Sequence, residues 1–158
     1  MANKLRLKLA HEAIERLTQL TDLFQQRREQ LAASAGLTVS QWSVLEEIST
    51  ERFMPSLFAA AEATSRAAVS KVIRQLLDRD LIHVAISQND GRQRDYALTA
   101  DGKATLERLR GERQKAIDAI WLPLDGDALQ HFSNFASLLQ ERIERFAAAE
   151  QNARKDKE

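Results

Sequence analysis

A helix followed at once by a β-hairpin, within residues 64–94, constrains the fold more than any other part of this sequence. Ser65 is a good N-cap residue, because its hydroxyl can accept hydrogen bonds from the first helical turn. We therefore expect a helix that begins near Arg66. Apolar residues recur in it at three- and four-residue spacing, which predicts a stripe packed on a core. The stripe consists of Val69, Val72, Ile73, Leu76 and Leu77.

The opposite face of this expected helix combines cations with small residues. Arg66, Ser70 and Arg74 follow one another at four-residue spacing, and Ala67 and Lys71 lie beside them. Small side chains let the helix approach another surface closely, and the cations surround that contact. A face of this kind suits the major groove of duplex DNA.

A β-hairpin is predicted directly after the helix. The β-rich runs 81–86 and 96–99 flank Asn89-Asp90-Gly91, and Asp-Gly between two such runs is a strong hairpin signal. Arg92 and Arg94 come just past the turn. A hairpin with arginines at its tip, between two helices, is typical of the wing of a winged-helix protein.

The basic charge of the chain is concentrated in this stretch. Residues 64–94 hold six Lys or Arg and three Asp, whereas the whole chain has 23 residues of each sign, so 17 basic and 20 acidic residues lie elsewhere. An ordinary solvated helix and a hairpin kept soluble by its charges would explain any one of these residues. Their combination favours one face that meets a phosphate backbone.

Composition excludes several other classes of protein. With 158 residues and 44% hydrophobic side chains, the chain can form one domain with a real core. It has no cysteine, which excludes disulfides and thiol chemistry. No apolar run is long enough to cross a membrane, and the start lacks a signal peptide, so we expect a soluble, cytoplasmic protein.

Helices are expected on both sides of the helix and wing. Residues 4–33 form one long helix that stops at Gly36, and Ser40 is the expected N-cap of a second helix. A third, short helix runs from Pro55 to about Ala63, so that a tight turn joins it to the cationic helix in a helix-turn-helix.

Two further helices follow the wing. Thr99 is the expected cap of a fifth helix that runs to about Trp121, and Pro123 breaks it. Asp125-Gly126-Asp127 then opens a sixth. We thus expect a single mainly α domain, 1–158, with a DNA-binding lobe at about 37–99. The flanking helices, about 4–33 and 100–150, carry more apolar surface than this lobe can cover, which predicts a homodimer.

The sequence resembles the MarR (multiple antibiotic resistance regulator) family of bacterial winged-helix repressors. The resemblance covers residues 37–102 and is strongest in Ser65-Arg66-Ala67-Ala68-Val69-Ser70-Lys71, in 76–82, and in Asp90-x-Arg92 with Leu98-Thr99-x-x-Gly102 after it. Ala63 and Asp80 stand where the family often has glycine. Glu62 stands where an apolar residue is usual, and Val84-Ala85 replaces a pair that is often basic.

This resemblance implies a homodimer whose recognition helices enter successive major grooves of a pseudo-palindromic operator. Arg92 would reach the minor groove, and Asp90 would help to hold the wing. The DNA-contacting residues are then expected to be Ser65, Arg66, Ala67, Ser70, Lys71, Arg74, Asp90, Arg92 and Arg94. Members of the family often bind small aromatic, phenolic or anionic effectors in the crevice beside the dimer helices. Trp42 would be a wall of that crevice, although a core position that satisfies its indole N–H is the simpler expectation.

Two other functions compete with DNA binding. An enzyme is disfavoured, because His11, His83 and His131 lie far apart and the sequence has no catalytic triad order, phosphate loop or metal-ligand spacing. We expect no cofactor and no metal. The stronger alternative is a winged-helix module that binds another protein through the same helix and wing.

Overall fold

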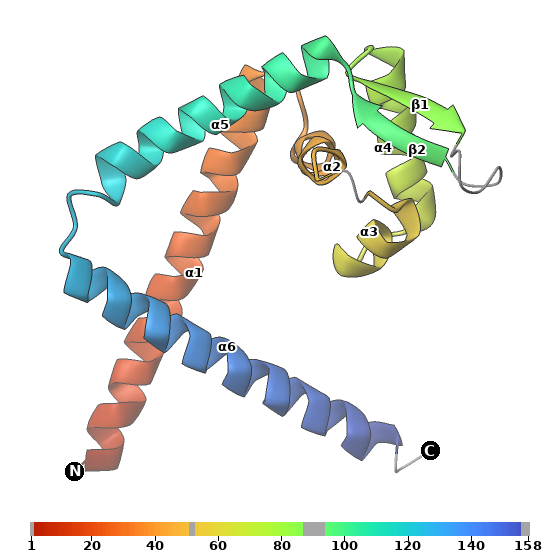
Figure 1. Ribbon diagram of the computed structural model, residues 1–158. Helices are drawn as coiled ribbons and strands as arrows, with labels where there is room; N and C mark the ends of the chain where they lie inside the picture. Colours follow the sequence, from red (N-terminus) through yellow and green to blue (C-terminus); the bar gives the residue numbers. More distant parts are fainter. Residues whose placement is uncertain (1, 51–52, 87–93, 156–158) are drawn as a thin grey trace. The chain divides into compact units, whose positions relative to one another are not determined.

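The computed structural model describes residues 2–50, 53–86 and 94–155. The described part is mainly helical, with one small antiparallel sheet (Figure 1). This confirms the predicted fold class. The elements are α1 (Ala2–Ser34), α2 (Val39–Ile48), α3 (Pro55–Ala61), α4 (Arg66–Asp78), β1 (Ile82–Ile86), β2 (Arg94–Leu98), α5 (Ala100–Ile120) and α6 (Gly126–Lys155).

Helix α1 ends in a glycine turn, as the sequence predicts. Gly36 has a φ of +68°, a left-handed conformation that favours glycine. Its N–H donates to the carbonyl of Ala33 (2.8 Å), and the N–H of Leu37 donates to that of Ala32 (2.9 Å). These bonds satisfy carbonyl groups that the end of a helix leaves without partners.

Helix α2 begins earlier than predicted. Its N-cap is Thr38 and not Ser40: the Thr38 hydroxyl accepts from the N–H of Gln41 (3.2 Å), and the Gln41 side chain accepts from the N–H of Thr38 (3.0 Å). Ser40 has a suitable hydroxyl, but a Gln three residues after Thr38 completes a reciprocal capping box. The start of α2 is therefore set by a pair of residues.

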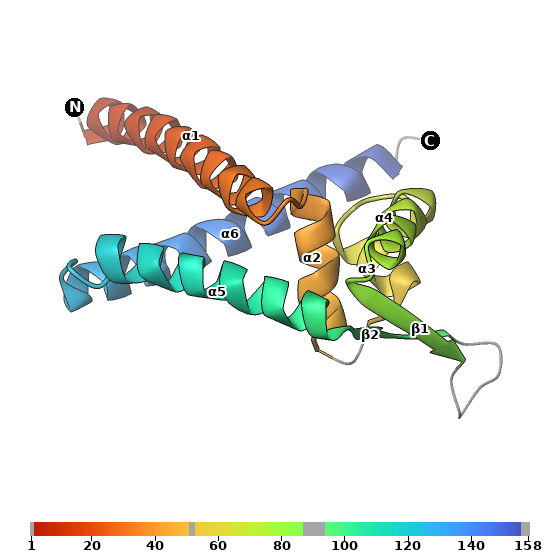
Figure 2. The same ribbon diagram turned by 90° about the horizontal axis from the view of Figure 1, so that it is seen from above.

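Helix α2 is the centre of the core. Both views show it between the carboxyl end of α1 and α4 (Figures 1 and 2). The stripe of α4 packs here, as predicted, with Val69, Ile73 and Leu76 buried and Val72 and Leu77 partly buried. The buried apolar residues are Leu31, Ala32, Ala35, Leu37, Trp42, Val44, Leu45, Ile48, Phe53, Ala59, Val69, Ile73, Leu76, Leu81, Ile82, Leu106 and Leu109.

The start of α5 is fixed against the end of α4. Thr99 caps α5 as predicted, since its Oγ1 accepts from the N–H of Gly102 (3.0 Å) and donates to the carbonyl of Asp80 (2.6 Å). A Cβ at Gly102 would lie 1.9 Å from the carbonyl oxygen of Leu81. Only glycine allows so close an approach, which gives the Leu-Thr-x-x-Gly motif a structural reason.

The chain divides into two compact units, residues 1–113 and 114–158. The second contains the end of α5 and helix α6, where a carboxylate oxygen of Asp125 accepts from the N–H of Ala128 (2.9 Å) and caps the helix. As the sequence predicts, α6 begins after the Pro123 break. Within the part of the chain that the structure describes, no helix is long and apolar enough to cross a membrane.

Candidate nucleic-acid interface

Helix α4 starts at Arg66 because Ser65 caps it. Ser65 has an extended backbone (φ −83°, ψ 149°), and its hydroxyl accepts a hydrogen bond from the N–H of Ala68 at 3.1 Å. A serine in this position satisfies a donor that the first turn leaves without a partner. The predicted N-cap and the predicted start of the helix are both confirmed.

The two faces of α4 differ as the sequence predicts. The side chains of Val69, Ile73 and Leu76 are buried in the core. The opposite side, which we call the cationic face of α4, is exposed. It consists of Arg66, Ala67, Ser70, Lys71 and Arg74. Helix α4 therefore presents its cations to solvent and not to the protein interior.

No carboxylate of the described residues pairs with the cations of this face. The ion pairs of the described residues include those of Lys8 with Glu12, Arg110 with Glu46 and Arg145 with Glu141, none of which lies on this face. The positive charges of Arg66, Lys71 and Arg74 are not compensated in this way. They are arranged to attract an external anion such as a phosphate group.

The turn before α4 holds a strained residue. The sequence predicts α3 to extend to about Ala63, but α3 ends at Ala61, because Ala63 adopts the left-handed conformation (φ +48°). The N–H of Thr64 then donates to the carbonyl of Ala59 at 2.9 Å. Ala63 thus makes the turn that glycine makes more easily, and α3 and α4 pack on each other as a helix-turn-helix.

The hairpin packs on the core through an aromatic side chain. Strands β1 and β2 are antiparallel, with Val84 opposite Tyr96 and Ile86 opposite Arg94. The Tyr96 ring meets the ring of Phe53 edge to face, with centroids 5.6 Å apart. Arg94 is exposed at the start of β2. Asp90 and Arg92 lie outside the described residues, so their roles remain predictions.

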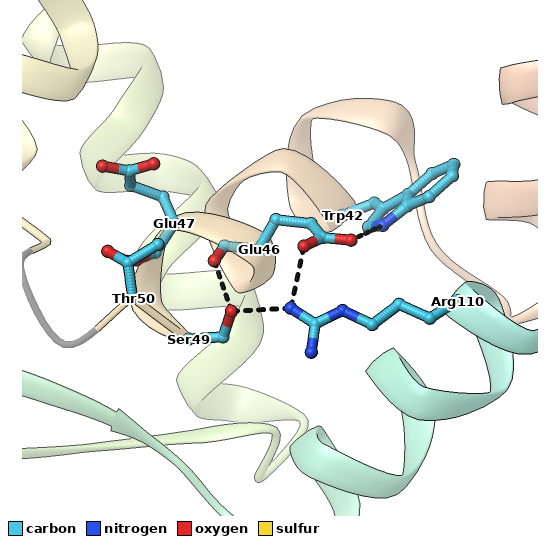
Figure 3. A network of polar contacts seen from close by, with 6 residues as sticks. All are labelled: Trp42, Glu46, Glu47, Ser49, Thr50 and Arg110. Atoms are coloured by element: carbon cyan, nitrogen blue, oxygen red, sulfur yellow. Dashed lines mark hydrogen bonds and ion pairs between the residues drawn. The ribbon is translucent and has the colours of Figure 1, made fainter. Parts of the chain in front are cut away.

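Trp42 is a core residue with a satisfied indole. Its side chain is only 6% exposed, and its Nε1–H donates to Oε1 of Glu46 at 3.2 Å (Figure 3). The other oxygen of Glu46 accepts from Nη2 of Arg110 at 3.0 Å. The same guanidinium nitrogen donates to Oγ of Ser49 at 2.8 Å. Glu46 thus connects the indole to α5.

A second arginine, Arg28 of α1, lies over the ring of Trp42. The guanidinium carbon of Arg28 lies 5.9 Å from the centroid of the indole ring, and its Nη2 donates to Oγ of Ser43 at 2.8 Å. A cation at this distance from an aromatic face is attracted by it. The core position expected for Trp42 is confirmed, and its role as a wall for an effector is still a prediction.

Sequence reasoning missed this network of Arg28, Trp42, Glu46 and Arg110. The spacing of Trp42 and Glu46, four residues apart on one helix, was a usable signal for their contact. Arg110 lies 64 residues beyond Glu46, and nothing local in the sequence indicates that pairing. Within the described ranges there is also no group of three or more His, Cys, Asp or Glu that could hold a metal ion.

No protein-family model and no curated protein matches the sequence, but solved structures match the fold. A MarR family transcription regulator superposes with a TM-score of 0.83 at 18% identity, covering 93% of this chain and 98% of that one. The chain has the MarR-family winged-helix fold. This confirms the resemblance found in the sequence, although sequence identity to the matched structures is low.

Two further structures with this fold contain bound small molecules or DNA. MarR of Staphylococcus aureus, in complex with salicylate and kanamycin, has a TM-score of 0.73 at 21% identity, with 87% of this chain and 93% of that chain covered. MepR of Staphylococcus aureus, in complex with DNA, has a TM-score of 0.63 at 17% identity, with 79% and 92% covered. This fold is therefore found in a transcription regulator and in a protein bound to DNA.

Proposed function

We propose that this protein is a sequence-specific, DNA-binding transcription regulator. The observation that carries the proposal is the cationic face of α4. The helix is capped by Ser65, and this face is exposed and has no carboxylate partner among the described residues. It lies in a fold that MepR uses in a complex with DNA. Ser65, Arg66, Ala67, Ser70, Lys71 and Arg74 would contact the major groove, and Asp90, Arg92 and Arg94 would serve the wing.

The regulator would act as a homodimer and a repressor, in the cytoplasm of a bacterium. Residues of about 37–99 would form its DNA-binding lobe, and helices of about 4–33 and 100–150 would form the dimer. Large exposed apolar side chains on α1 and α6, such as Leu23 (61% exposed) and Phe135 (56%), support this assignment, because a second copy of the chain would remove them from water. Two recognition helices related by a two-fold axis would read a pseudo-palindrome with half-site centres about 10 bp apart.

A small aromatic or anionic effector would release the DNA. The MarR structure of Staphylococcus aureus, which is in complex with salicylate, supports this part of the proposal. A ligand that prefers a spacing of the two lobes unsuited to successive grooves shifts the population away from the DNA-bound form. Titration with aromatic acids, followed by the melting temperature and by DNA affinity, tests this part alone.

Selection of duplexes from a random pool by the purified full-length protein tests the central proposal. We expect enrichment of a two-fold symmetric site, and a binding constant that falls steeply with salt because phosphate contacts release counterions. A site without internal symmetry would contradict the dimer.

The competing function, a winged-helix module for another protein, predicts a different result. It predicts weak binding to every duplex and no enriched sequence. Binding to duplex DNA with a shallow salt dependence would also favour it, since counterion release accompanies phosphate contact.

A further inference from the structure

The carboxyl end of α4 is tied to the turn between α1 and α2 by an arginine. Arg79, the C-cap of α4, donates from Nη1 to the carbonyl oxygen of Gly36 at 2.7 Å. Its Nη2 lies against the same glycine, 3.5 Å from the place that a Cβ would occupy. A guanidinium at the end of α1 also meets the negative end of that helix dipole, which favours this placement.

A glutamine pair makes a second connection one turn earlier. Nε2 of Gln41 donates to Oε1 of Gln75 on α4 at 3.1 Å. Oε1 of Gln41 is already used, because it accepts from the N–H of Thr38 in the capping box of α2. Gln41 is the one polar side chain that is buried among the described residues. A buried polar contact of this kind fixes one relative placement of two helices more strictly than apolar packing does.

Gln75 borders the cationic face, four residues after Lys71, but both Gln75 and Arg79 are bonded to other parts of the protein. Arg79 is five residues beyond Arg74, the last residue of that face, which corresponds to about 7.5 Å along a helix axis. Gln75 is half-buried and points toward α2 and not toward solvent. These two residues are therefore placed to hold α4 and not to read DNA.

We propose that Gln75 and Arg79 are positioning residues, which fix the tilt of α4 against the end of α1 and so set the half-site spacing that the protein accepts. This inference rests on the proposed function, because it needs a dimer that places two α4 helices on one duplex. In duplex DNA, each base pair adds about 3.4 Å along the axis of the double helix and rotates the groove by about a tenth of a turn. A small change in the tilt of α4 thus changes which spacing fits.

The test compares spacing preference and not affinity alone. Three duplexes carry the half-sites selected by the wild-type protein, with the spacer unchanged, shortened by one base pair or lengthened by one. We expect the wild-type protein to prefer the unchanged spacer by about tenfold, similar to the cost of a mismatched base pair. The double variant Gln75→Leu/Arg79→Gln should bind all three within about threefold.

Conservative variants and a charge control separate positioning from direct contact. Gln75→Glu keeps an acceptor for Gln41, and Arg79→Lys keeps a cationic donor, so both should retain the preference. Arg108→Gln removes one exposed charge from α5 and should also retain it. If the double variant does not fold, Gln75→Leu alone, with a folded state verified by thermal melting, gives the same comparison.

Two results would overturn the inference while leaving the proposed function intact. One is an unchanged spacing preference in the folded variants. The other is an equal loss of affinity on all three duplexes with a salt slope lower by about one unit, which would make Arg79 a phosphate contact. Failure of the wild-type protein to select any duplex would instead overturn the proposed function, and the inference with it.

Discussion

The winged-helix lobe and the long helices use their apolar side chains in opposite ways. Every large buried side chain described in the structure lies between Leu31 and Leu109. The large side chains of the first 24 residues of α1 and of residues 120–146 are mostly exposed. Both regions show helical apolar periodicity. The difference shows that periodicity predicts which face of a helix is apolar. Whether that face is buried depends on whether other residues of the same chain pack against it.

The largest expected effect comes from the same substitution made in both regions. Leu45 in the lobe is 0% exposed and Leu23 on α1 is 61% exposed. Leu45→Ala should lower the free energy of unfolding by about 2–5 kcal/mol, because it removes buried contacts and leaves a cavity. Leu23→Ala should act through association instead, so its effect should depend on protein concentration. Urea denaturation at two protein concentrations measures both, and equal losses at both concentrations for Leu23→Ala would remove the distinction.

The outward face of the lobe should carry the next largest effect, on DNA and not on stability. Arg66→Ala should weaken binding to the selected site by about 1–3 kcal/mol and relax the preference at one position of each half-site, if its guanidinium is bidentate to a guanine. Arg92→Ala should instead weaken binding across most sequences and lower the salt slope by about one unit per lost phosphate contact. Specific and scrambled duplexes at two salt concentrations separate the two.

Further variants can correct these assignments. Arg108→Ala on α5 should change neither quantity. If Arg92→Ala has no effect and Arg94→Ala abolishes binding, Arg94 is the wing residue that matters. If neither matters, the hairpin is not a wing that binds DNA.

A charge on α6 should break association and leave the lobe intact. Phe135→Glu places a carboxylate on the apolar side of α6, and we expect it to raise the dimer dissociation constant at least about tenfold, since an unpaired charge in an interface is costly. Ser133→Glu adds the same charge at another exposed position and serves as the control. Sedimentation over a range of concentrations gives the constants. A monomeric wild-type protein at micromolar concentration would count against the whole assignment of α1 and α6.

The smallest effect tests the strained turn of the lobe. Ala63→Gly should raise the free energy of unfolding by about 0.5–1 kcal/mol, because relief of the left-handed conformation exceeds the entropy cost of glycine. Ala60→Gly, within α3, should lower it by about 0.5–1 kcal/mol, because it adds the same entropy cost without relieving strain. Thermal or urea unfolding measures both. Equal signs for the two variants would show that the conformation of Ala63 costs little.

Sequence reasoning succeeded where one residue determines a local structure. Ser65 predicted the start of α4, Gly36 predicted the end of α1, and Thr99 predicted the cap of α5. It erred where two residues compete: Thr38 caps α2 because Gln41 completes the capping box, while Ser40 has the right hydroxyl without that partner. The end of α3 was also misplaced, since alanine is a good helix former and gives no sign of a left-handed turn.

Tertiary contacts of the candidate site were harder to predict than its elements. The cationic face of α4 followed from four-residue spacing, because spacing alone decides which side chains share a helix face. The bonds of Arg79 to Gly36 and of Gln41 to Gln75 join residues 43 and 34 positions apart. No local pattern encodes such pairs. They depend on how the helices pack, and the sequence gives no direct reading of that.

The backbone of Leu81 connects two elements that are distant in sequence. Its N–H donates to the carbonyl of Leu76 at the end of α4, and its carbonyl accepts from the N–H of Thr99 at 3.1 Å, with Gly102 pressed against the same oxygen. No side chain intervenes, so this joint has little of the slack that rotamer changes give to other contacts. A rotation of the first turn of α5 would therefore also move the last turn of α4.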